Sequence, residues 1–384
     1  MSKILNIIAL IFFLSYFANS QSIVEKSLSY LRNGKYEAAA ITIDKAIADP
    51  NLKNLPTTWF FRGKIYQELF LSDETKIYAL DTAYLSLIYA IKLDPDKEYL
   101  QNIILQLKML AANYYRLGGA YFNINNYKEA YKMFEKALDI NKTPILAVAD
   151  TALIYYSGIA AMKSGNTNDA KKLFNKLVFL KVVSFDFPLY LGEIYENENN
   201  IEEAVNTYKY GIDYCNENKI IYTLKVIKLL LQNGKTNDAE EYINIAKKID
   251  PNNAEVYFLE AEFYNLQMLD DESIKAYIKG LQIKPDDFQA NYNVGILMYN
   301  NAMIHGEAAE KYKYNSAQVN LYKKELSNYN RYLINSVRFL EVAYEQKPDD
   351  TILNKCLYDV YKRLNRSAQA EMVIENMKKY GITQ

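Results

Sequence analysis

The stretch Tyr114–Asn141, YYRLGGAYFNINNYKEAYKMFEKALDIN, contains two amphipathic halves joined by the polar turn NINN. Apolar residues recur in both halves at three- and four-residue steps: Tyr114, Leu117, Gly118 and Tyr121, then Tyr127, Ala130, Phe134 and Ala137. Such steps place residues on one face of a helix. Small residues at Gly118 and Ala130 would let two helices approach closely, with Phe134 filling the space beside them. The stretch therefore predicts a helical hairpin.

The same unit recurs along the chain. The small residue of each second helix gives nine markers: Ala39, Ala83, Ala130, Ala170, Ala204, Ala239, Ser273, Ser336 and Ala370. Four of the eight steps between these markers are 34 or 35 residues long, and the others are longer. Several units end in a proline, which stops the second helix because it cannot continue a helix. We therefore expect an array of similar hairpins.

This unit resembles the tetratricopeptide repeat, whose period of about 34 residues carries W-x2-L-G-x2-Y, then A-x3-F, then P. A single unit of this kind is a weak match, whereas nine in register are a strong one. The resemblance implies an all-α fold, a right-handed α-solenoid of about nine hairpins over residues 21–384. It also implies a concave groove, lined mainly by first helices, that binds partner proteins or peptides.

Two regions depart from the period in the first half of the chain. Residues 71–80 hold an excess that predicts a longer loop and an early start of the next helix. Apolar residues keep helical spacing from Leu100 to Tyr114, which predicts that this first helix begins several turns early.

The eighth unit contains a long insertion, residues 301–330, with no proline and a single glycine. Its apolar residues keep three- and four-residue steps into the closing helix: Val319, Tyr322, Leu326, Tyr329 and Leu333. We predict that this closing helix begins near Ser316 and projects beyond the solenoid wall. The projection is expected to serve protein–protein contact.

Residues 1–20 are typical of a secretory signal peptide. Lys3 precedes an apolar run, and the small residues Ala18 and Ser20 predict cleavage after Ser20. A membrane anchor is the alternative, but the run is shorter than the roughly 20 residues needed to span a bilayer. Gln21 is not the cysteine of a lipoprotein. The mature chain is expected to have no transmembrane span and to reach the periplasm, the outer membrane or the exterior.

The composition is balanced, with 45 basic and 46 acidic side chains in 384 residues. A nucleic-acid binder normally carries a basic stripe, so nucleic acid is not an expected partner. The only cysteines, Cys215 and Cys356, are 141 residues apart in an array whose distant repeats do not touch, so no disulfide is expected between them.

The residues needed for catalysis are missing. His305 is the only histidine, which excludes a Ser-His-Asp triad and a His-based metal site. No glycine-rich phosphate loop occurs. The acidic pairs 286–287 and 349–350 follow repeat-closing prolines, where they are expected to cap the next helix. We therefore expect no enzyme activity, no catalytic residue, no cofactor and no metal.

The candidate partner-binding residues are aromatic or apolar and lie on the expected groove or on the insertion: Phe60, Tyr115, Phe122, Tyr155, Met162, Phe258, Tyr292, Tyr299, Tyr322 and Tyr329. Packing against a neighbouring repeat is an equally weighted role for several of them. The Lys/Asn pair with which some family members hold a C-terminal carboxylate is absent. The expected function is a non-catalytic scaffold in the bacterial cell envelope, and the alternative is glycan binding on an aromatic groove.

Overall fold

A computed structural model describes residues 23–383, and all regular structure in that range is helical. The predicted signal peptide, residues 1–20, lies outside the described residues. The described chain divides into two compact units that meet between Phe187 and Pro188. The predicted all-α array of helical hairpins is confirmed within both units.

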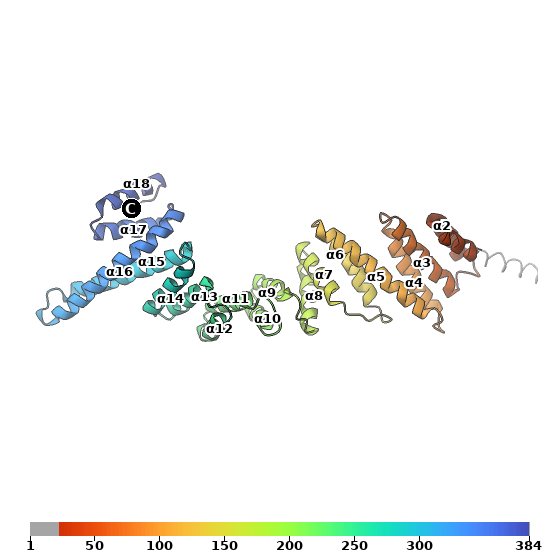
Figure 1. Cartoon of the computed structure of the whole chain (residues 1–384), viewed down its shortest axis with the longest axis horizontal. Coiled ribbons are helices and arrows are strands. Elements are labelled where there is room, and N and C mark those ends of the chain that lie inside the picture. The colour runs from red at the N-terminus through yellow and green to blue at the C-terminus, as the bar shows by residue number, and fades with distance from the viewer. Residues whose placement is uncertain (1–22, 384) are drawn as a thin grey trace, which may run out of the picture. The chain divides into compact units, whose positions relative to one another are not determined.

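The first unit contains the helix of residues 23–32 and the helices α2 (Tyr36–Ala48), α3 (Pro56–Ser72), α4 (Tyr78–Leu93), α5 (Leu100–Asn123), α6 (Tyr127–Asn141), α7 (Thr151–Lys163) and α8 (Thr167–Phe179). Consecutive helices pair as hairpins, and the second helices α2, α4 and α6 also touch the first helix of the next hairpin. Figure 1 shows α3 to α6 lying side by side.

The second unit contains α9 (Phe187–Asn197), which begins at the boundary, and α10 (Ile201–Tyr214), α11 (Lys219–Gln232), α12 (Thr236–Ile249), α13 (Ala254–Leu266), α14 (Asp270–Ile283), α15 (Phe288–Tyr312), α16 (Val319–Gln346), α17 (Thr351–Arg363) and α18 (Ser367–Lys379). A short 3-10 turn, Ser316–Gln318, precedes α16. The pair α15–α16 runs on well past α17 and α18 (Figure 1).

A shared turn closes most of the hairpins. Two positions before the second helix, seven of the described hairpins carry a residue with positive φ: Gly34, Asn125, Gly165, Asn199, Gly234, Met268 and Asn365. Glycine and asparagine adopt this left-handed conformation most readily, and there they satisfy the last carbonyls of the first helix. The α3–α4 and α15–α16 hairpins lack this turn, and they are the two whose sequences carry excess residues.

Close contact between first and second helices follows the predicted pairing of small with large residues. A Cβ added at Gly118 would lie 2.4 Å from the ring of Phe134, and one at Gly158 would lie 2.4 Å from the ring of Phe174. Ala130 is fully buried. The hairpins therefore depend on the absence of a side chain on the first helix at these positions.

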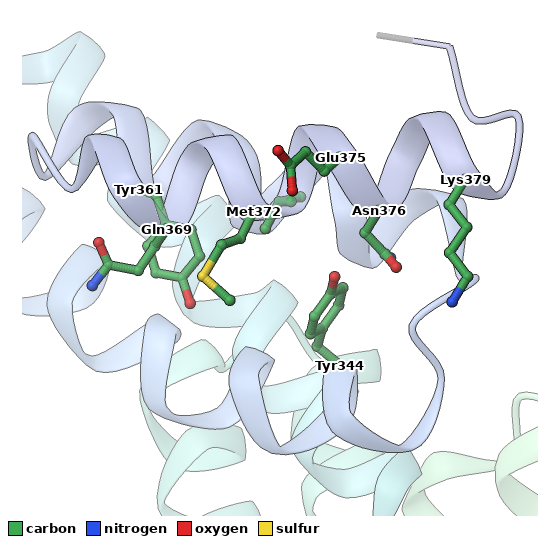
Figure 2. Close-up of a pocket in the computed structure, with 8 residues that line it drawn as sticks. Tyr344, Tyr361, Gln369, Met372, Glu375, Asn376 and Lys379 are labelled. Atoms are coloured by element: carbon green, nitrogen blue, oxygen red, sulfur yellow. The ribbon is translucent and has the colours of Figure 1, made fainter.

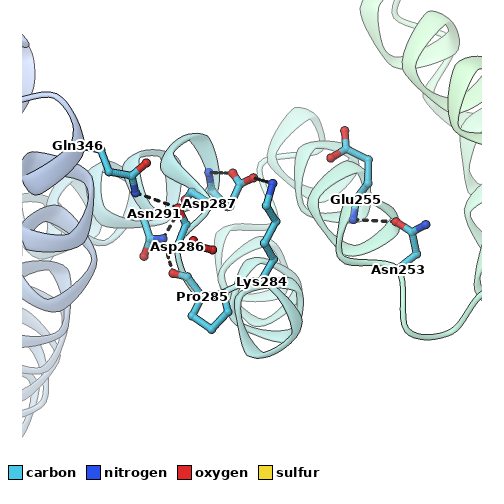
Figure 3. Close-up of polar contacts among 9 residues, drawn as sticks. Asn253, Glu255, Lys284, Pro285, Asp286, Asp287, Asn291 and Gln346 are labelled. Atoms are coloured by element: carbon cyan, nitrogen blue, oxygen red, sulfur yellow. Dashed lines mark hydrogen bonds and ion pairs between the residues drawn. The ribbon is translucent and has the colours of Figure 1, made fainter.

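The linkers that close the seventh and eighth repeats are tied by polar side chains. Asp287 accepts a hydrogen bond from the backbone N–H of Ala290 at the start of α15. The Asn291 amide donates to the carbonyls of Pro285 and Asp287, both at 2.8 Å (Figure 3). The predicted capping role of this acidic pair is confirmed.

The next linker repeats the arrangement. Asp350 accepts from the backbone N–H of Leu353, and the Asn354 amide donates to the carbonyls of Pro348 and Asp350. Near the C-terminal end of α16, the Gln346 amide donates to the carbonyl of Asp286, 60 residues away (Figure 3). These bonds fix the entry of each first helix relative to the preceding hairpin.

The early start of α5 at Leu100 is confirmed. The longer loop predicted at residues 71–80 is reduced to five residues because α3 itself continues to Ser72. The insertion is helical as predicted, but it lengthens the opening helix too: α15 runs to Tyr312 and packs along α16.

Candidate functional site

A groove between the first helices α13 and α15 is the first candidate site. It has a volume of about 260 Å³ and is lined by Glu262, Asn265, Tyr277, Tyr292, Asn293, Ile296, Leu297 and Asn300. All the lining residues but Tyr277 come from these two first helices, whose positions the repeat fixes. Within the second unit this is the surface on which the family resemblance predicts partner binding.

The groove combines an apolar floor with polar edges. Ile296 and Leu297 are partly buried and pack on the core. Asn293 already donates to the Tyr277 hydroxyl at 3.1 Å. By contrast, the side chains of Asn265 and Asn300 form no hydrogen bond within the described residues. Their amides can therefore donate to and accept from a bound backbone.

Glu262 supplies the groove with a carboxylate that has no ion pair within the described residues. Burial raises its pKa, the nearby Glu255 adds to that rise, and Lys228 on α11 opposes it. Its side chain is exposed to solvent at the edge of the groove. A cationic or hydrogen-bond-donating group of a ligand would relieve this desolvation.

A larger pocket lies where the α15–α16 pair passes the end of α17. It has a volume of about 780 Å³ and is lined by Tyr299, Met303, Gly306, Glu307, Ala309, Glu310, Lys311, Tyr322, Leu326, Tyr329 and Arg363. A Cβ added at Gly306 would lie 3.0 Å from the Tyr329 ring, so the glycine lets this ring rest on α15. Three of the predicted tyrosines thus share one pocket.

The inner end of this pocket is held by a polar cluster. The Tyr299 hydroxyl donates to Asp359 at 2.8 Å, and Arg363 pairs with the same carboxylate. Burial, and then this acceptor, raise the pKa of Tyr299, while the bond to Asp359 raises the pKa of Arg363. Tyr299, Asp359 and Arg363 thus bond to one another within the fold, and they hold the end of α17 against α15.

The histidine of the chain is also structural. The His305 ring on α15 pairs with Glu325 on α16 and stacks on Tyr332, with ring centroids 5.5 Å apart. The Tyr332 hydroxyl in turn donates to Asp271 on α14. This chain of contacts ties the base of the extension to the preceding hairpin.

A third pocket, of about 400 Å³, lies between α16, α17 and α18 (Figure 2). The Tyr361 hydroxyl donates to Glu341, and the Asn376 amide donates to the Pro348 carbonyl. Met372 on its rim is 68% exposed. Because its central polar groups are already paired within the fold, this pocket is a weaker candidate than the first two.

Comparisons with known proteins give matches over parts of the chain. A family described as "Uncharacterized protein conserved in bacteria (DUF2225)" matches residues 61–188. The curated "TPR repeat-containing protein YpiA" of Bacillus subtilis (strain 168) is 30% identical over 125 residues, or 33% of this chain and 28% of that protein. Over this stretch the chain is similar to a tetratricopeptide repeat protein. The match spans little more than a quarter of the length of that relative.

Solved tetratricopeptide repeat structures are also similar. The C-terminal part of a TPR repeat-containing protein from Cytophaga hutchinsonii aligns with a TM-score of 0.47 and 16% identity, covering 70% of this chain and 96% of that one. YrrB, described as a TPR protein with an unusual peptide-binding site, aligns with a TM-score of 0.42 and 18% identity, covering 51% of this chain and 97% of that one. No helix among residues 23–383 is long and apolar enough to cross a membrane.

The predicted binding residues of this repeat protein fall into two groups. Phe60, Tyr155 and Phe258 are buried. Phe60 packs against Tyr99, with ring centroids 6.0 Å apart, and Phe258 lies against Gly280. Tyr155 stacks on Phe185 and donates its hydroxyl to Asp186. For these three residues the structure shows the packing role.

The remaining candidates keep part of their surface. Tyr292 lines the groove, and Tyr299, Tyr322 and Tyr329 line the larger pocket. In the first unit Met162 is partly buried, and Tyr115 and Phe122 are partly buried beside the Phe134 ring. These residues are not brought into a pocket with the others, and their role in binding stays a prediction.

Sequence reasoning missed the polar edge of the groove. Glu262, Asn265 and Asn300 were not among the predicted site residues. Their signal was available in the repeat register, since all three lie on the groove side of first helices. The predicted set contained only aromatic and apolar residues, so these three polar residues were left out.

Proposed function

We propose that this tetratricopeptide repeat protein is a non-catalytic scaffold that binds a segment of a partner protein. The partner occupies the α13–α15 groove and also contacts the α15–α16 extension. The observation that carries the proposal is the groove itself: an apolar floor at Ile296 and Leu297 beside the unpaired polar groups of Glu262 and Asn300.

An extended peptide matches that surface in chemistry. Its backbone presents unpaired N–H and C=O groups along its whole length, and the amides of Asn265 and Asn300 can pair with them. Its apolar side chains can rest on Ile296 and Leu297, while a basic side chain or N-terminus can approach Glu262. The glycan alternative needs exposed aromatic rings in the groove, but of the predicted aromatic candidates only Tyr292 lines it, and Phe60, Tyr155 and Phe258 are buried. We therefore favour a peptide.

The test is a screen of mature protein, residues 21–384, against displayed linear peptides, followed by affinity measurements on the enriched sequences. Glu262→Lys should weaken binding by tenfold or more, because it reverses the charge at the groove edge. Glu241→Lys is the matched control, since Glu241 is exposed on the second helix α12. Equal affinity of Glu262→Lys and wild type for all enriched peptides would refute groove binding.

We further propose that the protein works in the bacterial cell envelope after export. Support comes from the sequence of residues 1–20, with its single lysine, apolar run and small residues before Gln21. N-terminal sequencing of the protein from fractionated cells should give Gln21 as the first residue. A cytoplasmic protein that keeps Met1 or Ser2 would contradict this location.

A further inference from the structure

One surface of the α15–α16 pair is covered by α17 along one half and is open along the other half. The covered half holds α17, which contacts both helices: Asp359 accepts from Tyr299 on α15, and Tyr361 donates to Glu341 on α16. Buried apolar residues of α17, including Leu357 and Val360, belong to the same core cluster as those of α15 and α16. A helix is therefore what this surface binds within the chain.

The open half begins where α17 ends. Arg363, the last residue of α17, lines the larger pocket. From Tyr299 the helix α15 continues to Tyr312, which at about 1.5 Å per residue is roughly 20 Å of further surface. We call the open part the shelf, and its walls are Met303, Gly306 and Glu310 of α15 and Tyr322, Leu326 and Tyr329 of α16.

The shelf has the pattern of a helix-packing surface. Tyr322, Leu326 and Tyr329 follow one another at steps of four and three residues, so they form one row on α16. The same row continues inward to Leu333 and Leu340, which are fully buried. The row thus passes from buried core to open surface close to the point where α17 stops.

We propose that the shelf binds an amphipathic α-helix of a partner protein, packed as a continuation of α17. This inference rests on the proposed scaffold function and specifies the partner for the extension. Leu326 is 36% exposed and would be covered by the apolar face of such a helix. The bound helix should carry apolar residues at i, i+3 or i+4, and i+7.

The polar groups of the shelf favour a helix over an extended peptide. An extended segment needs side chains that pair with its backbone, as the amides of the α13–α15 groove can do. The shelf instead offers charged groups at its rim, Glu307, Glu310 and Lys311, of which Glu310 is already paired with Lys313. A helix satisfies its own backbone and needs only an apolar face with charged flanks. The two sites therefore select different conformations.

The experiment uses a displayed library of 14-residue amphipathic peptides stabilised as helices, with scrambled peptides of equal composition as the comparison. The full mature protein should enrich helices with the stated spacing. Leu326→Asp should weaken the enriched helices by tenfold or more. Leu321→Asp is the matched control, because Leu321 is 42% exposed on the same helix and does not line the shelf.

Enrichment of scrambled peptides equal to that of helices would overturn the inference, as would equal binding by the Leu326→Asp and wild-type proteins. Self-association of the wild type that Leu326→Asp abolishes in sedimentation would also overturn it, because a second copy would then occupy the shelf. The proposed groove is judged separately, by the effect of Glu262→Lys on linear peptides. Failure of the shelf to bind amphipathic helices would therefore not contradict the binding of linear peptides in the α13–α15 groove.

Discussion

The ring of Phe134 occupies the space in which a side chain at Gly118 would lie, 2.4 Å from the position of an added Cβ. Gly119, the next residue of the same helix, has no atom within 4 Å of its added Cβ. Two adjacent glycines in α5 thus have opposite roles. Gly118 permits the contact between α5 and α6, whereas Gly119 only adds backbone freedom.

Gly118→Ala should therefore destabilise the first unit by about 1–3 kcal/mol, because the new methyl group overlaps the Phe134 ring. Gly119→Ala is the matched control and should stabilise it by about 0.5–1 kcal/mol, since alanine is the better helix former. Thermal unfolding followed by circular dichroism, together with hydrogen exchange of α5 and α6, measures both. Equal effects of the two substitutions would show that the helices do not depend on Gly118.

The linker arrangement gives a second prediction. Asn291 is 2% exposed and its amide donates to two carbonyls, so Asn291→Ala should cost about 1–3 kcal/mol by removing both bonds and leaving the Pro285 carbonyl without this donor. Asn354→Ala should cost less at the equivalent position, though more than a surface change, because the Pro348 carbonyl keeps the Asn376 amide as a donor. Asn300→Ala, at an exposed site of the same helix α15, should change stability by no more than about 0.5 kcal/mol. Denaturant unfolding that ranks Asn300→Ala with the other two would contradict this.

Sequence periodicity predicted the hairpins well because the interactions that define them are local. Spacing such as that of Leu117, Gly118 and Tyr121 is fixed by the geometry of a single helix. Periodicity also predicted the start of α16 to within three residues, since Tyr322, Leu326 and Tyr329 follow helical spacing. It did not predict the extension of α15 to Tyr312, because polar residues interrupt its row there.

The sites were harder to predict because periodicity tells which residues share a face, not what covers that face. Phe258 was expected to face the groove, but the ring turns under Gly280 of the next helix. The pocket of Tyr299, Tyr322 and Tyr329 depends on where α17 stops, which the periodicity of α15 and α16 does not reveal. Glu262 and Asn300 are ordinary exposed residues in sequence, and only the approach of α13 to α15 makes them edges of one groove.

Stability at high pH should depend on buried tyrosines. The Tyr66 hydroxyl donates to Asp44 at 2.6 Å. Burial first, and then this carboxylate, raise the pKa of Tyr66 to about 12. The unfolded chain has a tyrosine pKa near 10, so the neutral phenol favours the fold. That contribution is complete below pH about 10 and is lost as the pH rises through about 12.

The free energy of unfolding should consequently fall between pH 10 and 12, and Tyr66→Phe should reduce the slope. Asp44→Asn keeps a hydrogen-bond acceptor but removes the negative charge that helps to raise the pKa of Tyr66. The upper end of the pH range over which stability falls should therefore move to lower pH. Denaturant titrations at a series of pH values, with tyrosinate absorbance as the second readout, measure these effects. A wild-type stability that stays flat over this range would contradict the prediction.

Removing the outer part of the extension should separate binding from folding. Between Glu307 and Asn330 only Ala309 is buried, so this segment contributes little to the core. A variant that replaces residues 307–328 with a short asparagine-glycine turn keeps the contact of Gly306 with Tyr329. It loses the pair of His305 with Glu325 but keeps the stacking of His305 on Tyr332 and the bond of Tyr332 to Asp271. Helicity per residue and melting temperature should therefore remain close to those of the full chain.

The same variant lacks Glu310, Tyr322 and Leu326, and with them most of the shelf. It should fail to bind the amphipathic helices that the full chain enriches, while its affinity for linear peptides in the α13–α15 groove stays unchanged. Circular dichroism and fluorescence polarisation with both classes of probe give the two readouts. If the variant unfolds, the extension is part of the structural core of the second unit. If it is folded and still binds the helices, the shelf is not their site.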